Sequence, residues 1–257
     1  MKIRLLPSTL DENGSATEQQ HYSCILVNES VAIDAGSLAN AVGESERMAV
    51  RDIVLTHAHL DHIAGLPLFI DDLFSVLTEP VRVHASIEVI DILEEHIFNW
   101  HVYPRFSELS NKNGKVIEYV SIGGNEFFIR NLRFRPVAVN HKVPSMGFIV
   151  SDERSAFALT GDTAEMDGFW ETVNSLGKID LLLIECAFPD EFEELAAISH
   201  HLTPKKLAIE IAKFSHLDCP IRVINIKPVY REAVVRQLRE LNIERLGVFE
   251  IGRKHEI

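Results

Sequence analysis

LTHAHLDH, residues 55–62, is the most informative stretch of the chain, because it places three histidines and one aspartate within six positions. It continues the apolar run DIVL (52–55), which is typical of a buried strand. A strand that ends in a loop can turn closely spaced side chains toward one point, whereas a continuing strand alternates them between its faces. Imidazole and carboxylate groups bind metal ions, so the stretch predicts part of a metal site that needs further ligands from elsewhere. Its candidate ligands are His57, His59, Asp61 and His62.

The composition predicts a globular protein with ample core material, since 46% of the 257 residues are hydrophobic and 25% are charged. Lys and Arg number 25 against 38 Asp and Glu, which gives a net charge of −13. A chain this acidic lacks the basic face of a nucleic-acid-binding protein, and an anionic membrane would repel it. No apolar run reaches the length of about 18 residues that a membrane span needs. We therefore expect neither nucleic acid nor membrane as a partner.

The three cysteines, Cys24, Cys186 and Cys219, are odd in number and too widely spaced for a CxxC metal site. This pattern disfavours a disulfide framework and predicts reduced, buried thiols in a cytoplasmic protein. The 12 histidines are the excess that needs an explanation, because histidine is the commonest metal ligand and the usual proton carrier near neutral pH.

Short β-patterned runs fill the first half of the chain, and strands alternate with helices in the second half. This order predicts an α/β (α+β) fold in which helices flank a pair of sheets. Gly-Gly-Asn at 123–125 predicts a hairpin turn. The expected strands are 2–7, 23–28, 31–36, 52–57, 81–85, 116–122, 126–139, 147–151, 155–162, 179–185 and 221–226. The expected helices are 63–77, 86–102, 164–176, 203–215 and 229–242.

THAHLDH resembles the HxHxDH motif of the metallo-β-lactamase superfamily. The resemblance implies a four-layer αββα sandwich with a two-metal site between the sheets. It also implies one domain over residues 1–257, with a helical insertion at about 63–110. His141 before PSMGF and Asp162 in LTGDT resemble later motifs of that superfamily. The implied ligands are His57, His59 and His141 for the first metal, Asp61 and His62 for the second, and Asp162 as the bridge.

One position departs from the superfamily pattern. The segment VINIKP (223–228) places Asn225 where a last metal-binding histidine is expected. An amide oxygen can bind a hard or borderline cation, but more weakly than imidazole binds it. The resemblance therefore implies two divalent ions, zinc first, with manganese or iron as alternatives and Asn225 as a weak ligand of the second ion. A loose or absent second ion is the alternative.

Two further segments favour one branch of the superfamily. HIFNWHVYPRF (96–106) resembles a segment of class II cyclic-nucleotide phosphodiesterases, and His201 in HLTP resembles a second motif of those enzymes. The resemblance implies hydrolysis of 3′,5′-cyclic AMP, with cyclic GMP as a further candidate, to the 5′-monophosphate by a bridging hydroxide. The implied partners are a small cyclic nucleotide and, as in many relatives, a second copy of the chain in a homodimer.

Catalytic and substrate-binding roles follow from the same resemblance. His201 is the expected proton donor to the leaving 3′-oxygen, because imidazole titrates near working pH, and Glu185 is expected to orient it. Asp61 is expected to handle protons as well as metal. Asn99 and His101 are expected to contact the base or the phosphate.

Three other functions remain open at this point. HLTP also resembles the corresponding motif of tRNA 3′-processing endonucleases, although the acidic charge opposes an RNA substrate. A hydrolase of another phosphodiester is the second alternative, because a fold does not fix its substrate. The third is a non-catalytic nucleotide-binding relative whose metal site is degraded at Asn225.

Overall fold

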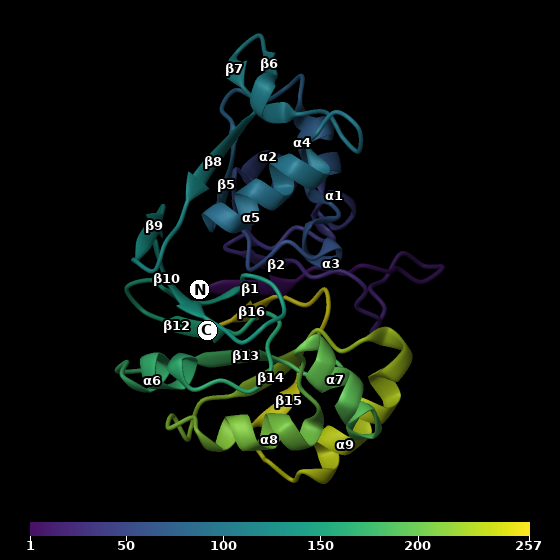
Figure 1. The fold of residues 1–257 in the computed structure, drawn as a ribbon, viewed down its shortest axis with the longest axis vertical. Coiled ribbons are helices and arrows are strands. Elements are labelled where there is room, and N and C mark those ends of the chain that lie inside the picture. The colour runs from purple at the N-terminus through teal and green to yellow at the C-terminus, as the bar shows by residue number, and fades with distance from the viewer.

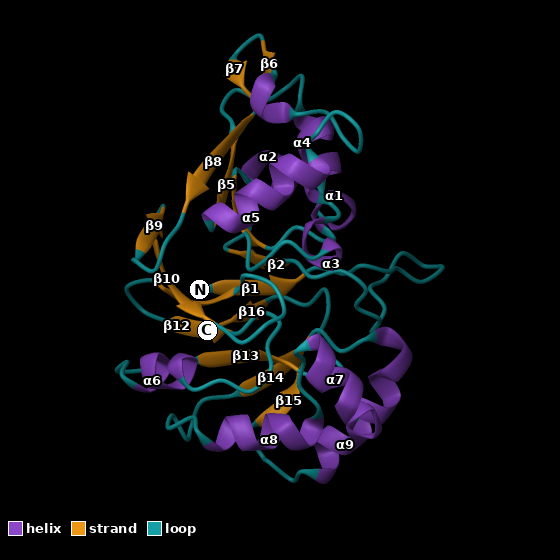
Figure 2. Ribbon diagram, viewed as in Figure 1, coloured by secondary structure: helices purple, strands orange, loops and turns teal.

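The computed structural model describes all 257 residues and contains two seven-stranded sheets, one above the other in Figures 1 and 2. The first sheet consists of β1 (Lys2–Leu5), β2 (Ile25–Val27), β3 (Val31–Ile33), β4 (Asp52–Val54), β5 (Val81–Ala85), β8 (Ile117–Ser121) and β16 (His255–Glu256). The second consists of β9 (Phe127–Ile129), β10 (Leu132–Ala138), β11 (Met146–Ser151), β12 (Ala156–Leu159), β13 (Leu181–Glu185), β14 (Ile221–Ile224) and β15 (Leu246–Val248).

Both sheets follow the same plan of pairing. The first has the order β16-β1-β2-β3-β4-β5-β8, and the second has the order β9-β10-β11-β12-β13-β14-β15. Read in these directions, three antiparallel pairs precede three parallel pairs in each sheet. The parallel halves matter for function, because all their strands end at the same edge of a sheet and ligand sites form beyond such ends.

Helices cover the outer face of each sheet (Figure 2). Those on the first sheet are α1 (Leu38–Ala41), α2 (Glu44–Ala49), α3 (Leu60–Ile63), α4 (Leu66–Leu73), α5 (Ile87–Ile92), the π-helical η1 (Leu93–Ile97) and the 3₁₀ turn η2 (Phe106–Glu108). Those on the second are α6 (Gly168–Asn174), α7 (Glu193–Ser199), α8 (Pro204–Ala212), α9 (Arg231–Glu240) and the 3₁₀ turns η3 (Asp190–Phe192) and η4 (Pro228–Tyr230). A small hairpin, β6 (Ser110–Asn111) and β7 (Gly114–Lys115), lies at the far end of the first layer.

Alternating side chains of the strands fill three separate apolar layers. In β2, Ile25 and Val27 join the cluster between the sheets, whereas Leu26 joins the cluster under the helices of the first sheet. In β12, Phe157 packs between the sheets and Ala158 packs under the helices of the second sheet. Three apolar layers between four layers of secondary structure confirm the predicted αββα sandwich.

Several expected elements are wrong in detail. The run 126–139 is two strands, β9 and β10, because the chain turns between them at Arg130, whose φ is +55°. Residues 123–125 do not form a hairpin turn, because β8 before them belongs to the first sheet and β9 after them to the second. The expected helix at 63–77 is divided into α3 and α4 around Gly65.

The helix expected over 86–102 also ends early. Regular α-helix stops at Ile92, a π-helical turn follows to Ile97, and Trp100 has a left-handed φ of +68°. The pattern did not predict several short elements, each of seven residues or fewer: α1, α2, α7, β6, β7, β15 and β16. None of the helices combines the length and the hydropathy that crossing a membrane requires.

Gly36 sets how closely the histidine loop approaches the first sheet. A Cβ atom at this position would lie 2.0 Å from the backbone oxygen of Asp61 and 2.8 Å from that of Ser23. The close approach allows two backbone hydrogen bonds to form. Ser23 N–H donates to the oxygen of Asp61 at 2.8 Å, and Ala35 N–H donates to that of His62 at 2.7 Å.

We predict that Gly36→Ala destabilises the fold by about 3 kcal/mol, the upper range for an overpacked site, because backbone atoms on both sides block the methyl group. In a chain of this size, that loss lowers Tm by roughly 6–12 °C. Thermal unfolding followed by circular dichroism measures it. Gly123→Ala is the control, since its Cβ would meet nothing within 4 Å, and equal Tm values for the two variants would contradict the prediction.

Candidate metal centre

The strand ends of both sheets bring the candidate residues to one place. The HxHxDH residues follow β4, Asp162 follows β12 by three positions, and Asn225 follows β14 directly. Glu185 is the last residue of β13. The site therefore lies where the carboxyl ends of parallel strands from the two sheets meet.

His57, His59 and His141 form the first group. One ligand atom from each lies within 4.8 Å of the other two. Nε2 of His57 is buried and has no hydrogen-bond partner, which is costly for a polar atom. Nε2 of His141 lies 3.1 Å from Nδ1 of His59, while Nδ1 of His141 donates to the oxygen of His200 at 3.0 Å. Three convergent nitrogens, one of them without a partner, fit a divalent metal ion.

Burial keeps these three rings in the neutral form that binds metal. Burial lowers the pKa of His57 well below its usual range and lowers the pKa of His141 to about 4. The pKa of His59 is lowered for the same reason. Neutral imidazole is the form with a free lone pair, so the electrostatics agree with the geometry.

Asp162 and His62 form a second group with His57. Asp162 is almost fully buried, and its Oδ2 lies 3.3 Å from Nε2 of His62 and 4.0 Å from Nε2 of His57. Burial would lower the pKa of His62, but Asp162 and Asp34 outweigh burial and raise it well above its usual value. The carboxylate thus lies between the two groups of histidines, as a bridging ligand would.

Asp34, which was not among the predicted site residues, supports both groups. Its Oδ2 accepts a hydrogen bond from Nδ1 of His62 at 2.7 Å, and its Oδ1 accepts from Thr56 N–H at 2.8 Å. The Thr56 hydroxyl also donates to this carboxylate, so it accepts from Nδ1 of His57 at 3.0 Å. Asp34 thereby leaves Nε2 of both rings free for metal. The only signal in the sequence is an aspartate directly after the apolar strand VAI.

The structure places the side chain of His201 next to that of Glu185. Nδ1 of His201 donates to Oε1 of Glu185 at 2.8 Å. Glu185 is fully buried and also accepts from the N–H groups of Thr163 and Ala187, at 3.0 and 2.9 Å, so its position is fixed. Burial would lower the pKa of His201, but the Glu185 carboxylate outweighs burial and raises it. The His201 ring is 5.1 Å from the ring of His141, between centroids.

Asp61 and Asn225 are close to the centre but make other contacts. Oδ2 of Asp61 forms an ion pair with Nζ of Lys227 at 3.0 Å. Nδ2 of Asn225 donates to Oδ1 of Asp162 at 2.6 Å, and its Oδ1 accepts from Nε2 of Gln20 at 3.2 Å. Lys227 and Gln20 were not among the predicted site residues, although Lys227 stands in the segment VINIKP.

Asn99 and His101 are not brought to the centre by any hydrogen bond. The Asn99 side chain donates to the oxygen of Glu95 at 2.9 Å and accepts from the N–H groups of His101 and Val102, at 3.0 and 2.9 Å. It therefore stabilises its own turn, and His101 is exposed. Phe98 and Phe106 of the same segment are core residues under the helices of the first sheet.

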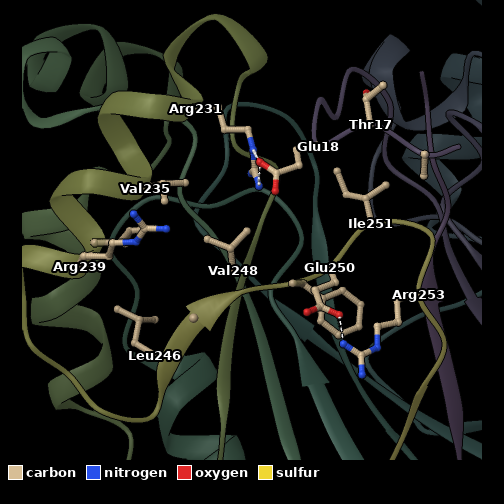
Figure 3. Close-up of a pocket in the computed structure, with 14 residues that line it drawn as sticks. Thr17, Glu18, Arg231, Val235, Arg239, Leu246, Val248, Glu250, Ile251 and Arg253 are labelled. Carbon is tan, nitrogen blue, oxygen red and sulfur yellow. Dashed lines mark hydrogen bonds and ion pairs between the residues drawn. The ribbon is translucent and has the colours of Figure 1, made fainter. Parts of the chain in front are cut away.

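Two of the hollows in the protein are candidate places for a bound substrate. A cavity of about 130 Å³ lies beside the centre and is lined by residues that include Gln20, Asp61, His62, Asn225 and Lys227. A larger hollow of about 590 Å³ lies between α9, β15 and residues 16–18 (Figure 3). Its labelled arginines include Arg231 and Arg253, which pair with Glu18 and Glu250. No histidine or cysteine lines it, whereas Asp61 and His62 of the HxHxDH motif line the smaller cavity.

The beta-lactamase superfamily domain matches residues 25–218. The chain belongs to the metallo-β-lactamase superfamily. It is similar to a probable 3′,5′-cyclic-nucleotide phosphodiesterase of Yersinia pestis, with 24% identity over 78% of this chain and 63% of the relative. It is also similar to the 3′,5′-cyclic-nucleotide phosphodiesterase of Schizosaccharomyces pombe, with 27% identity over 74% of this chain and 58% of the relative. The chain thus spans less than two thirds of the length of either relative.

Other similarities extend across the superfamily. The chloroplastic tRNase Z TRZ2 of Arabidopsis thaliana is 26% identical over 52% of this chain and 35% of its own length. The structure of unliganded yeast PDE1 superposes with a TM-score of 0.73, covering 98% of each chain at 16% identity. At that identity, the superposition supports the fold alone.

We predict that Asp34→Asn weakens metal binding by about 10–100-fold, the usual effect of losing an outer-shell partner. The NH₂ group of the new amide must face either Nδ1 of His62 or the Thr56 hydroxyl. It then disturbs the tautomer of His62 directly, or that of His57 through Thr56, and the disturbed ring can no longer bind metal through Nε2. Competition with a zinc chelator measures the affinity. Asp152→Asn is the control, because Asp152 also accepts from backbone N–H groups but in a loop outside the centre. An unchanged zinc affinity in Asp34→Asn would refute the assignment.

Proposed function

We propose that the chain is a metal-dependent hydrolase of phosphodiester bonds and that its substrate is 3′,5′-cyclic AMP, with cyclic GMP as a further candidate. The observation that carries the proposal is the buried, unpartnered Nε2 of His57 among His59 and His141, a few ångströms from Asp162. The two relatives called cyclic-nucleotide phosphodiesterases support the substrate class. The tRNase Z relative aligns with a smaller part of the chain, and the charge of −13 opposes RNA.

The donor set favours zinc, because imidazole and carboxylate groups suit Zn²⁺, with Mn²⁺ or Fe²⁺ as alternatives. His57, His59 and His141 would hold a divalent ion, which would supply the Lewis acidity that hydrolysis of a phosphodiester needs. We further propose a cytoplasmic location, because Cys24, Cys186 and Cys219 are all buried and free of disulfides.

His201 is the group that we propose to protonate the leaving 3′-oxygen. Its Nδ1 is committed to Glu185, which leaves Nε2 with no hydrogen bond to the protein. Glu185 cannot swing away, because two backbone N–H groups hold it in addition to His201. The imidazole is therefore fixed in direction with one nitrogen free, which is what proton transfer to a bound substrate requires.

We predict that His201→Ala keeps its metal and loses about 10²–10⁴-fold in kcat, the usual effect of removing a general acid. His59→Ala loses metal and activity together, because it removes a ligand. Metal content by mass spectrometry, measured beside kcat, separates the two effects. His96→Ala on the exposed surface is the control and keeps both quantities. Full turnover in His59→Ala would rule out the assigned centre.

The substrate class is tested by a turnover panel with Zn²⁺, Mn²⁺ and Fe²⁺. It compares 3′,5′-cyclic AMP, 3′,5′-cyclic GMP, a 2′,3′-cyclic nucleotide, bis(p-nitrophenyl) phosphate and a tRNA precursor. We expect the 3′,5′-cyclic nucleotides to have the highest kcat/KM, and Asp162→Ala to abolish turnover. Preferential cleavage of the tRNA precursor would favour the tRNase Z alternative. Binding of cyclic nucleotide with no turnover above that of Asp162→Ala would favour a non-catalytic relative.

A further inference from the structure

The amide of Asn225 faces the centre with its nitrogen. The backbone N–H of Asn225 donates to the Gln20 side chain at 3.2 Å, so the atom that receives it must be the oxygen Oε1. The other atom of the Gln20 amide is then Nε2, a donor, and it contacts Asn225 at 3.2 Å, which must therefore be the oxygen Oδ1. What remains for Asp162 is the NH₂ group of Asn225, which donates at 2.6 Å. The orientation of both amides is thus fixed by one backbone N–H.

The Gln20 side chain and the backbone conformation of Asn225 both hold the Asn225 amide in this orientation. Gln20 is nearly buried and reaches Asn225 across 205 positions of the chain. Asn225 has a left-handed φ of +55°, a conformation that asparagine adopts more readily than most residues. Turning the amide over would set oxygen against the Asp162 carboxylate and NH₂ against the NH₂ of Gln20. A ligating oxygen at position 225 would therefore set the two NH₂ groups against each other, even where an ion separated the oxygens of Asn225 and Asp162.

The carboxylate of Asp61, like that of Asp162, is paired with a donor of the protein. Lys227 lies two positions after Asn225, and its ammonium forms the ion pair with Asp61 at 3.0 Å. Both residues line the cavity of about 130 Å³, together with His62 and Asn225. A cation bound by Asp61 would have to displace the ammonium. By contrast, no side-chain donor of the protein contacts Nε2 of His57 in the first group.

We propose that this chain holds one divalent ion tightly, on His57, His59 and His141 next to Asp162, and that the Lys227 ammonium and the Asn225 amide take the place of a second ion beside Asp61 and Asp162. The proposal rests on the proposed metal-dependent hydrolysis and makes it more specific. Lys227 is then a positioning residue with a point charge that suits a phosphate oxygen. The family's two-ion pattern applies to this chain only in part.

The test is to count bound zinc and to measure its affinity without any substrate. Purified protein is saturated with Zn²⁺, separated from free ion by gel filtration and analysed by mass spectrometry, and calorimetry gives the dissociation constant of each ion. We expect the native chain to keep one ion and Asn225→His to keep two, with the second bound at least about 10-fold tighter than in the native chain. Lys227→Met, which frees Asp61, should also tighten the second ion and leave the first unchanged.

Asn242→His is the matched control. Asn242 is exposed, lies outside the centre and has a φ of +51°, so the same substitution is made in the same backbone conformation. Two tightly held ions in the native chain would overturn the proposal, and this outcome does not depend on whether Asn225→His folds. No retained ion would overturn it together with the metal site. One retained ion with no phosphodiester turnover would overturn the proposed function and leave this inference standing.

Discussion

The buried Asp34 carboxylate is the constraint on which the rest of the centre depends. Through Nδ1 of His62 directly, and through the Thr56 hydroxyl to Nδ1 of His57, it sets which nitrogen of each ring carries the proton. Without that constraint, either nitrogen of each ring could carry the proton, and Nε2 would not be kept as the atom that offers its lone pair to an ion. Gly36 serves the same end, because the loop that carries the histidines can lie against the first sheet only where no side chain intervenes.

The sequence predicted the layers of the fold and the groups that come from strand ends. HxHxDH, His141 and Asp162 follow apolar strands and Glu185 ends one, and the carboxyl ends of parallel strands meet in space, whereas His201 follows the short helix α7. What it could not predict depends on contacts between distant segments. Gln20 and Asn225 are 205 positions apart, and Lys227 and Asp61 are 166 apart. Their pairing follows from the packing of two sheets, which no local pattern contains.

Asn99 and His101 show that a sequence motif does not predict the direction of a side chain. A resemblance gives residue types in order, but it does not say whether a polar side chain faces a ligand or its own backbone. In this chain Asn99 caps the turn that begins where the π-helical segment ends, and the aromatic residues around it are divided between core and surface. Asparagine competes for nearby backbone groups in irregular segments, so this outcome follows from the early end of the helix.

The net negative charge of the chain and the positive charge of the centre both affect how tightly the proposed product, a phosphate monoester, is held. A cyclic phosphodiester carries one negative charge, whereas a phosphate monoester carries about −1.5 to −2 near neutral pH. In the proposed one-ion arrangement, the Lys227 ammonium takes the place of a second divalent ion, so the centre holds one unit of positive charge less than a two-ion centre without that ammonium would hold. Because attraction scales with the product of the charges, this deficit weakens binding of the doubly charged product more than that of the singly charged substrate. The net charge of −13 acts in the same direction. Product release limits turnover in many enzymes, so a lysine in place of an ion favours release at the step where charge has increased.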